Sequence, residues 1–202
     1  IMASWYDVLD KIGSQPGVVM VLGASDSGKT TLITFLGNEL LKLGKKVAIV
    51  DADIGQSDIG PPCTIGMGFL KEPTERLNNI DLSSIYFVGA TSPPGHLLPM
   101  VVGTKRMVEK ALVQGVDVVL IDTTGLIQGE IGKTLKYYKI ELIRPRHIIL
   151  LQDKDELESL ISSFTTLSNL IIHRLPIGAQ VRERSLEERA LYRKERFNSY
   201  FK

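Results

Sequence analysis

The chain has 202 residues, of which 44% are hydrophobic and 23% are charged, and its formal net charge is +1. These values fit one folded domain and exclude a disordered chain, while the overall charge argues neither for nor against nucleic-acid binding. We expect no membrane span, because no apolar run approaches the ~18 residues that one requires, and no signal peptide. Since Cys63 is the only cysteine, no internal disulfide can form and we expect a reducing, intracellular (cytoplasmic) location.

The first segment, residues 1–16, is predicted to hold a short amphipathic helix, because apolar side chains recur at helical spacing over residues 5–12. Two aromatic residues, Trp5 and Tyr6, open this helix. We expect them to pack onto the edge of the sheet. The alternative is a platform on which a base stacks.

A glycine-rich motif follows at residues 23–30, which fit the pattern G-x-x-x-x-G-K-[ST]. The apolar run 17–22 before it predicts a buried strand, and residues 31–43 after it have helical spacing. A strand, a glycine loop and a helix in this order aim backbone N–H groups at a polyphosphate. We therefore predict an ATP site that comprises Gly23, Ala24, Ser25, Asp26, Ser27, Gly28, Lys29, Thr30 and Thr31.

Within this loop, two side chains have distinct predicted roles. The Lys29 ammonium is expected to reach the terminal phosphates, and the Thr30 hydroxyl is expected to ligate Mg²⁺. The motif alone leaves open what the chain does with the γ-phosphate.

An acidic segment follows the second predicted strand, residues 45–50. Its aspartates, Asp51, Asp53 and Asp58, lie at the carboxyl end of a strand, where ligands bind in open α/β sheets. The alternative is a solvated acidic turn that caps the next segment. Residues 63–79 show little periodicity and are predicted to be a connecting loop.

A proline-rich loop, residues 91–99, follows the third predicted strand at 85–89. A rigid, irregular loop in this place is a candidate wall over a bound substrate. His96 within it is predicted either to contact a phosphate or sugar or to be structural. A helix is predicted over 100–113.

The next apolar strand, 116–121, ends in Asp122, as does the strand of P-loop NTPases that presents its aspartate to Mg²⁺. The neighbouring Thr123 and Thr124 offer hydroxyls at the same rim, and Gly125 permits a close backbone approach to phosphate. We predict that these three residues take part in substrate binding.

The remaining core elements are predicted to be a helix over 132–143, a strand over 146–151, a helix over 154–164 and a strand over 169–175. The lysines of the first helix, Lys133, Lys136 and Lys139, are expected to form a solvated face. Apolar strands that alternate with helices predict a parallel sheet with helices on both faces, in a core that spans residues 17–178.

The C-terminal segment, residues 179–202, is predicted to be a helical lid. From Arg174 onward the chain carries eight basic and four acidic residues. Ser185 is a plausible N-cap with Glu188 three positions later, which predicts a capping box and a helix over 185–201. The arginines suit either a salt-bridged exposed surface or a lid that stabilises phosphoryl transfer.

Taken together, these motifs resemble those of the Clp/Grc family of polynucleotide 5′-hydroxyl kinases. Residues 23–31 look like its Walker A motif, residues 51–56 like its Asp-x-Asp-x-Gly-Gln element and residues 123–125 like its Thr-x-Gly element. The segment from Glu183 onward resembles its arginine lid, and the loop from Thr91 lies where this family has a clasp over nucleic acid.

The resemblance implies a transfer of the ATP γ-phosphate to the 5′-hydroxyl of RNA or DNA, with one role for each matched position. Asp53 would be the general base, Lys29 would bridge the γ-phosphate, and Arg184 and Arg189 would be the lid arginines. The residues that would organise Mg²⁺ are Thr30, Asp53 and Asp122. The residues that would position the acceptor end or the phosphates are Gln56, Thr123 and Gly125.

Three alternatives stay open on the residues themselves. The first is a nucleotide-dependent switch of the SIMIBI group, although residues 152–155 have the wrong order for the guanine-reading motif of its GTPases. The second is an ATP-binding scaffold without activity that serves in RNA processing, and the third is a small-molecule kinase such as a nucleoside kinase.

Overall fold

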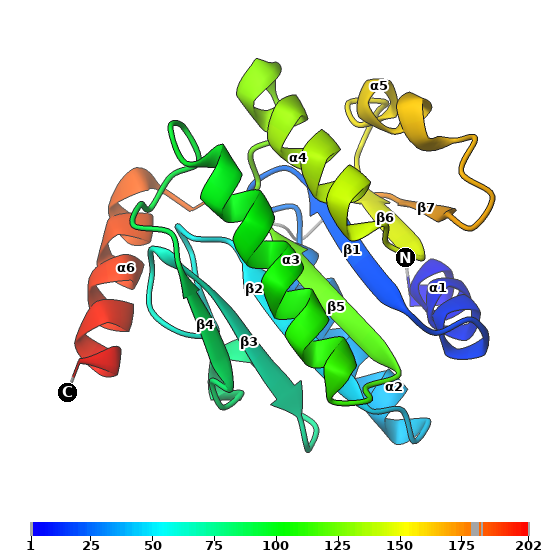
Figure 1. Ribbon diagram of the computed structural model, residues 1–202, viewed down its shortest axis with the longest axis horizontal. Helices are drawn as coiled ribbons and strands as arrows, with labels where there is room; N and C mark the ends of the chain where they lie inside the picture. The colour runs from blue at the N-terminus through cyan, green and yellow to red at the C-terminus, as the bar shows by residue number, and fades with distance from the viewer. Residues whose placement is uncertain (1, 179–181, 183, 202) are drawn as a thin grey trace.

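The computed structural model describes residues 2–178, 182 and 184–201, and within them seven strands form one sheet (Figure 1). The strands are β1 Val18–Gly23, β2 Val47–Ala52, β3 Thr64–Leu70, β4 Ser84–Phe87, β5 Val118–Thr123, β6 His147–Leu151 and β7 Ile171–Leu175. The helices are α1 Met2–Ser14, α2 Lys29–Lys42, α3 Leu97–Val113, α4 Gly129–Ile143, α5 Glu158–Ile161 and α6 Leu186–Tyr200. Two 3₁₀ turns cover Leu77–Asn79 and Ser162–Phe164.

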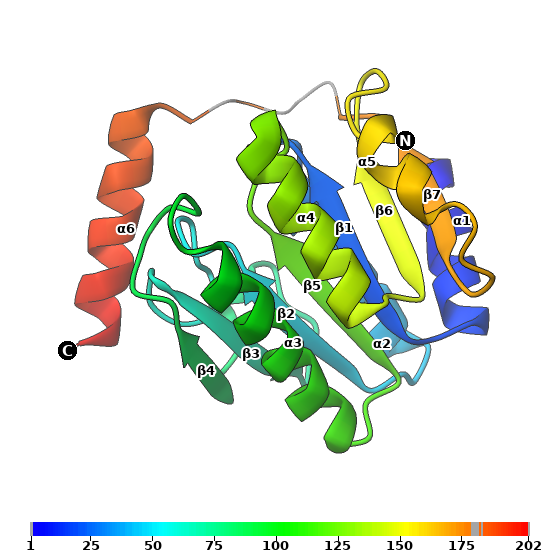
Figure 2. The ribbon, with the colours of Figure 1, turned by 45° about the horizontal axis from the view of Figure 1, so that its top comes forward.

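The sheet has the order β4-β3-β2-β5-β1-β6-β7, and its five strands from β2 to β7 are mutually parallel. The three strands at the centre of the seven-stranded sheet are β2, β5 and β1. They are buried along their whole length, as the apolar runs predict for strands covered on both faces. Helices α3 and α4 cover one face and α1 and α2 the other (Figures 1 and 2). The predicted α/β fold with helices on both faces is confirmed.

The prediction of a loop over 63–79 is wrong, because β3 lies within it and runs antiparallel to both β2 and β4. The sheet is therefore mixed rather than wholly parallel. Two glycines hid the strand pattern. A Cβ added to Gly66 would lie 1.8 Å from the Ile59 carbonyl oxygen, and one on Gly68 would lie 2.6 Å from that of Asp81. Both glycines lie on the same face of β3, which is pressed against backbone there, so only Ile65, Met67 and Phe69 on the other face carry the apolar pattern of the strand.

The helix predicted over 154–164 is much shorter than expected. Only Glu158–Ile161 is α-helical, and a 3₁₀ turn follows. The Glu156 carboxylate accepts hydrogen bonds from the backbone N–H groups of Asp153 and Lys154, which holds this stretch in a turn.

The C-terminal helix α6 begins as its capping box predicts. The Ser185 hydroxyl accepts from the Glu188 N–H, and the Glu188 carboxylate accepts from the Ser185 N–H at 2.7 Å. No residue of α6 is buried, so this helix lies on the surface of the core (Figure 2). Of the predicted lid segment, residues 179–181, 183 and 202 lie outside the described residues, and the division into helix, core and lid stays a prediction. Every described helix is too short or too polar to cross a bilayer.

Candidate active site

The carboxyl ends of the central strands surround a cavity of about 670 Å³. Three groups of polar residues line it: the phosphate loop 25–31, three carboxylates and three arginines. The carboxylates belong to Asp53, Asp58 and Asp122, and the arginines are Arg182, Arg184 and Arg189. Trp5, Gln56, Leu151 and Gly178 complete the wall. Groups that can bind phosphate, which are the loop and the arginines, therefore share one cavity with carboxylates that can accept a proton.

The phosphate loop connects β1 to α2 in the shape that its sequence predicts. Its chain reverses through two residues with positive φ, Asp26 at 56° and Gly28 at 91°. No side chain caps the N-terminus of α2 at Gly28. The N–H groups of the first turn thus point into the cavity without a side-chain cap, which is the arrangement that binds phosphate.

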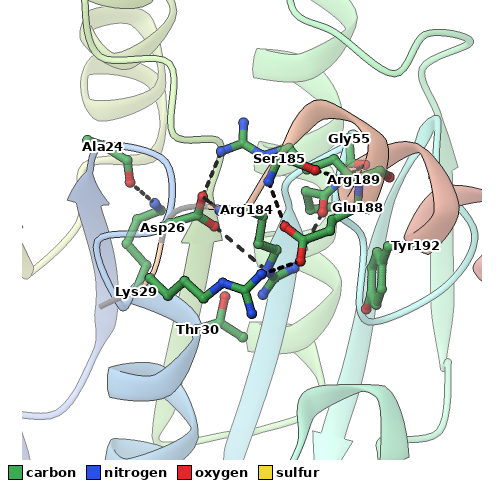
Figure 3. Close-up of polar contacts among 12 residues, drawn as sticks. Ala24, Asp26, Lys29, Thr30, Gly55, Arg184, Ser185, Glu188, Arg189 and Tyr192 are labelled. Atoms are coloured by element: carbon green, nitrogen blue, oxygen red, sulfur yellow. Dashed lines mark hydrogen bonds and ion pairs between the residues drawn. The ribbon is translucent and has the colours of Figure 1, made fainter. Parts of the chain in front are cut away.

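Lys29 opens α2 and is buried, with its Nζ donating to the Ala24 carbonyl oxygen at 2.6 Å (Figure 3). Burial lowers the pKa of this ammonium, and the nearby carboxylates Asp122, Asp53 and Asp26 oppose that shift. The lysine is held by its own loop at the place where phosphate oxygens would be bound.

Thr30 lies beside the buried carboxylate of Asp122, to which its hydroxyl donates at 2.6 Å. Burial raises the pKa of Asp122 to about 6, while the Lys29 charge and the Thr30 hydrogen bond act in the opposite direction. A hydroxyl and a carboxylate in contact at the mouth of a phosphate loop are oxygen donors of the kind that Mg²⁺ prefers. The residues present therefore fit a magnesium ion.

In the acidic segment after β2, one aspartate has a structural role and another faces the cavity. Asp51 is buried and its carboxylate accepts from the backbone N–H groups of Asp53, Asp58 and Ile59. It organises the loop from inside, and burial raises its pKa well above the usual value. Asp53 faces the cavity instead, with Oδ1 accepting from the N–H groups of Gly55 and Gln56 at 3.1 Å each.

The arginines at the start of the C-terminal segment contact the phosphate loop through one carboxylate (Figure 3). Asp26 accepts from the backbone N–H of Arg184 at 3.0 Å and from Nη2 of Arg189 at 2.6 Å. The Arg184 guanidinium also lies 3.4 Å from Oε1 of Gln56. Both predicted lid arginines therefore lie at the cavity, on the side of Asp53.

Further along α6, two residues hold the helix to the acidic segment: Tyr192, to which sequence reasoning gave no role, and Arg196, which it counted among the lid arginines. The Tyr192 hydroxyl donates to the Asp58 carboxylate. The Arg196 guanidinium donates to the backbone carbonyls of Ser57, Asp58 and Gly60. Only their spacing of four residues on one face of a helix could have suggested a common partner.

The predicted substrate residues at the end of β5 and just after it do not line the cavity. Thr123 is fully buried and donates its hydroxyl to the Val21 carbonyl of β1. Gly125 is pressed against the phosphate loop, since an added Cβ would lie 2.3 Å from the Ser25 nitrogen. Thr123 therefore joins β5 to β1, and Gly125 supports the phosphate loop. His96 precedes α3, where its Nδ1 lies 3.1 Å from the Pro94 carbonyl oxygen, outside the described cavity lining.

The expected solvated lysine face of α4 is wrong for two of its three lysines. Lys133 is exposed, whereas Lys136 and Lys139 are fully buried. The Lys136 ammonium donates to the Thr124 carbonyl at 2.5 Å and so holds the segment after β5. No described residue accepts a hydrogen bond from Nζ of Lys139. Their spacing from Leu135, Ile140 and Ile143 places both lysines on the apolar face of α4, and this signal could have predicted their burial.

Comparison with known proteins relates this site to one family. Residues 23–202 match the family model described as the mRNA cleavage and polyadenylation factor CLP1 P-loop. A polyribonucleotide 5′-hydroxyl-kinase from Thermococcus kodakarensis is 43% identical over 197 residues, which are 96% of this chain and 55% of that protein. The chain belongs to the CLP1 P-loop family. Another relative, a polyribonucleotide 5′-hydroxyl-kinase from Methanocaldococcus jannaschii, is 42% identical over 95% of this chain and 52% of its own length.

The chain thus spans about half the length of the curated relatives that it matches. Among solved structures, Clp1p in a complex of Clp1p and Pcf11p superposes with a TM-score of 0.79 at 16% identity, over 99% of this chain and 54% of that one. FtsY from Elizabethkingia anophelis superposes with a TM-score of 0.52 at 15% identity, over 98% and 72% of the two chains. At these identities the likeness shows the fold alone, and nucleotide binding follows from the P-loop family that the chain matches.

Proposed function

We propose that this member of the CLP1 P-loop family is an ATP- and Mg²⁺-dependent kinase of polynucleotide 5′-hydroxyl ends. The observation that carries the proposal is the position of the Asp53 carboxylate, which shares one cavity with the phosphate loop and with two arginines of the C-terminal segment. A base, a phosphate cradle and cations for the transferring group are the parts that phosphoryl transfer to an alcohol requires.

In the proposed reaction, Asp53 accepts the proton of the 5′-hydroxyl while that oxygen bonds to the γ-phosphorus. The bond from the γ-phosphorus to the bridging oxygen of ATP breaks, and ADP leaves. One oxygen of Asp53 is already oriented by the N–H groups of Gly55 and Gln56, so the carboxylate is held in place before the acceptor arrives. A positioned carboxylate contributes about 10²–10⁴-fold to such a step.

The charge that develops on the phosphoryl oxygens is proposed to be absorbed by Lys29, Arg184 and Arg189. All three carry a positive charge into the same cavity. A magnesium ion, held by Thr30 and Asp122, would supply further charge neutralisation at the phosphates. Gln56, which contacts Arg184, is placed to orient the acceptor.

The 39–43% identity to archaeal relatives named polyribonucleotide 5′-hydroxyl-kinases supports a nucleic-acid acceptor. We include both RNA and DNA ends in the proposal, because the described cavity shows stacking and charged groups but no set of base-reading residues. The intracellular location expected from the single cysteine belongs to the same proposal.

The test is an incubation of the chain with γ-labelled ATP, Mg²⁺ and three classes of acceptor: 5′-OH RNA, 5′-OH DNA and free nucleosides. The proposal requires label on an oligonucleotide with a 5′-OH end and none on an oligonucleotide that already carries a 5′-phosphate. Label on nucleosides alone would show a small-molecule kinase instead. Label on none of them would leave a nucleotide-binding switch or scaffold.

The matched control is Asp53→Asn, which keeps the shape of the side chain and removes its ability to accept a proton. We expect a rate about 10²–10⁴-fold lower with ATP affinity nearly unchanged. Unchanged turnover in this variant would exclude Asp53 as the base.

A further inference from the structure

The donor cavity extends to both sides of the central strand β1. Asp53 follows β2, which lies two strands away in the order β2-β5-β1. On the other side, Leu151 ends β6, the neighbour of β1, and Gly178 follows β7 at the sheet edge. The transferable phosphate of the proposed reaction must point toward Asp53. The nucleoside end of the same molecule must therefore lie on the β6 side of the loop.

The side chain that occupies the wall there is Trp5 of α1. Helix α1 packs against α2 and against the edge strand β7, as Figure 1 shows. The Trp5 ring is held by aromatic packing, with its centroid 5.3 Å from that of Phe35 in α2. Tyr6 also packs on Phe35, edge-on, with the two ring centroids 5.2 Å apart. The indole is thus fixed from α2, the helix that begins at the phosphate loop.

A role in packing alone does not account for a tryptophan at this position. No described residue accepts a hydrogen bond from its indole N–H, whereas a buried indole usually finds such a partner. Its ring instead borders the polar cavity, whose lining also includes Thr31 at the start of α2 and the apolar Leu151. A flat aromatic surface beside an aliphatic side chain is suited to the face of a purine.

We propose that Trp5 is the platform on which the base of the donor nucleoside triphosphate stacks. The ligand is a purine nucleoside triphosphate, with its phosphates on loop 25–31 and its base between Trp5 and Leu151. This inference rests on the proposed function, because the direction of the nucleotide follows from the position of Asp53.

The chain contains one tryptophan, so its intrinsic fluorescence reports on this site directly. We would titrate the full chain with ATP and, separately, with inorganic tripolyphosphate, both with Mg²⁺. ATP should quench the fluorescence and bind more tightly, because only ATP carries a base. Equal affinity and equal fluorescence response for the two ligands would overturn the proposal.

Trp5→Leu is then compared with Trp5→Phe by calorimetry, after thermal melts have shown that both variants are folded. Because stacking on an aromatic side chain contributes about 1–3 kcal/mol, Trp5→Leu should weaken ATP binding about 5- to 150-fold. Tripolyphosphate binding should stay unchanged, and Trp5→Phe should retain most of the affinity for ATP. An equal loss for ATP and tripolyphosphate would show that Trp5 only supports α1 and would contradict the proposal.

The control variant is Asp10→Ala, which changes an exposed residue of the same helix. Asp10 lies outside the described cavity lining and outside the aromatic packing of Trp5, Tyr6 and Phe35, so both ligands should bind as before. These measurements are equilibrium binding experiments. A chain that binds ATP through Trp5 yet labels no oligonucleotide would refute the proposed kinase activity and leave the base platform standing.

Discussion

The phosphate loop and the C-terminal helix α6 meet at the same cavity but are held in opposite ways. The loop joins β1 to α2, and both elements contribute fully buried side chains to the core. Helix α6 has no buried residue and contacts the core through polar groups, chiefly Asp26, Gln56 and Asp58. Apolar burial fixes the phosphate loop, whereas hydrogen bonds between polar groups hold α6 to the core. We therefore expect α6 to detach at little cost to the fold.

This difference predicts that catalysis and stability separate in α6. Arg189→Ala should lower the rate of phosphoryl transfer about 10²–10³-fold, because it removes a charged donor from the transferring group. The melting temperature should stay nearly unchanged, since no residue of the helix is buried. Steady-state kinetics and a thermal melt of the same preparation measure both quantities.

Lys194→Ala is the control, because Lys194 is an exposed residue of the same helix and lies outside the described cavity lining. It should leave the rate unchanged. A large fall in the melting temperature of Arg189→Ala would mean that α6 is part of the folded core. It would contradict the prediction that α6 contributes to catalysis but little to stability.

Stability should respond instead to a charge inside the core. Lys139 is fully buried, and burial lowers its pKa to about 8 from 10.5. Between these pH values the unfolded chain binds the proton and the folded chain does not, so stability rises with pH in this window. Lys139→Met should remove that slope and stabilise the fold at pH 7 by roughly 3 kcal/mol.

Chemical denaturation at several pH values measures the effect of Lys139→Met. Lys133→Met is the matched control on the exposed side of the same helix, where we expect a change within about 0.5 kcal/mol. A destabilised Lys139→Met with its pH slope intact would indicate that the charge of Lys139 is compensated in the fold.

The docking of α6 onto the core should be weakened without a change in the stability of the core. Tyr192→Phe removes the hydroxyl that donates to Asp58, a contribution of about 1 kcal/mol or roughly fivefold in the docking equilibrium. Amide hydrogen exchange should become faster in α6 and stay unchanged in β1. Tyr200→Phe, at the 46% exposed end of the helix, should change neither rate. Faster exchange in both elements would show that the lid and the core unfold together.

The same contrast explains what the sequence could predict. The phosphate loop, the buried strands and the capping box at Ser185 follow from local rules of period and capping, and all were confirmed. Strand β3 was missed, because Gly66 and Gly68 leave one of its faces without side chains and the apolar pattern rests on the other face alone. Local pattern is informative where each residue contributes a side chain to one face.

The contacts of the site depend on long-range geometry, and only some of them could be predicted from the sequence. Asp53 was identified by its place after a strand, but the structural role of Asp51 two residues earlier was not. Lys136, which holds the Thr124 carbonyl, was expected to be exposed because it is charged, although its spacing from Ile140 and Ile143 places it on the buried face of α4. A contact between elements far apart in the chain leaves no mark in the spacing of either one.

The smallest effect that we predict lies at the opposite end of the core. His147 is buried, its Nε2 lies 2.7 Å from the Gln15 carbonyl oxygen, and its Nδ1 lies 3.0 Å from Nε2 of His173. The carbonyl can only accept, so His147 donates there and must accept from His173 through Nδ1. A proton on Nδ1 of His147 would set two donors against each other.

Burial and the neighbouring His147 lower the pKa of His173 to about 4 from 6.5. The unfolded chain therefore binds more protons between these pH values, and stability should fall as the pH drops through that window. His173→Gln keeps an N–H donor to His147 and cannot be charged. Its free energy of unfolding, measured by chemical denaturation, should therefore depend less on pH, with a difference from the unmodified chain of about 1 kcal/mol at pH 5. Exchange in α6 should not follow this titration, because the pair lies on β6 and β7 and no hydrogen bond or ion pair joins it to α6 among the described residues. If exchange in α6 became faster at a higher pH than exchange in the sheet, the histidine pair would not be the group that determines the acid sensitivity of the core.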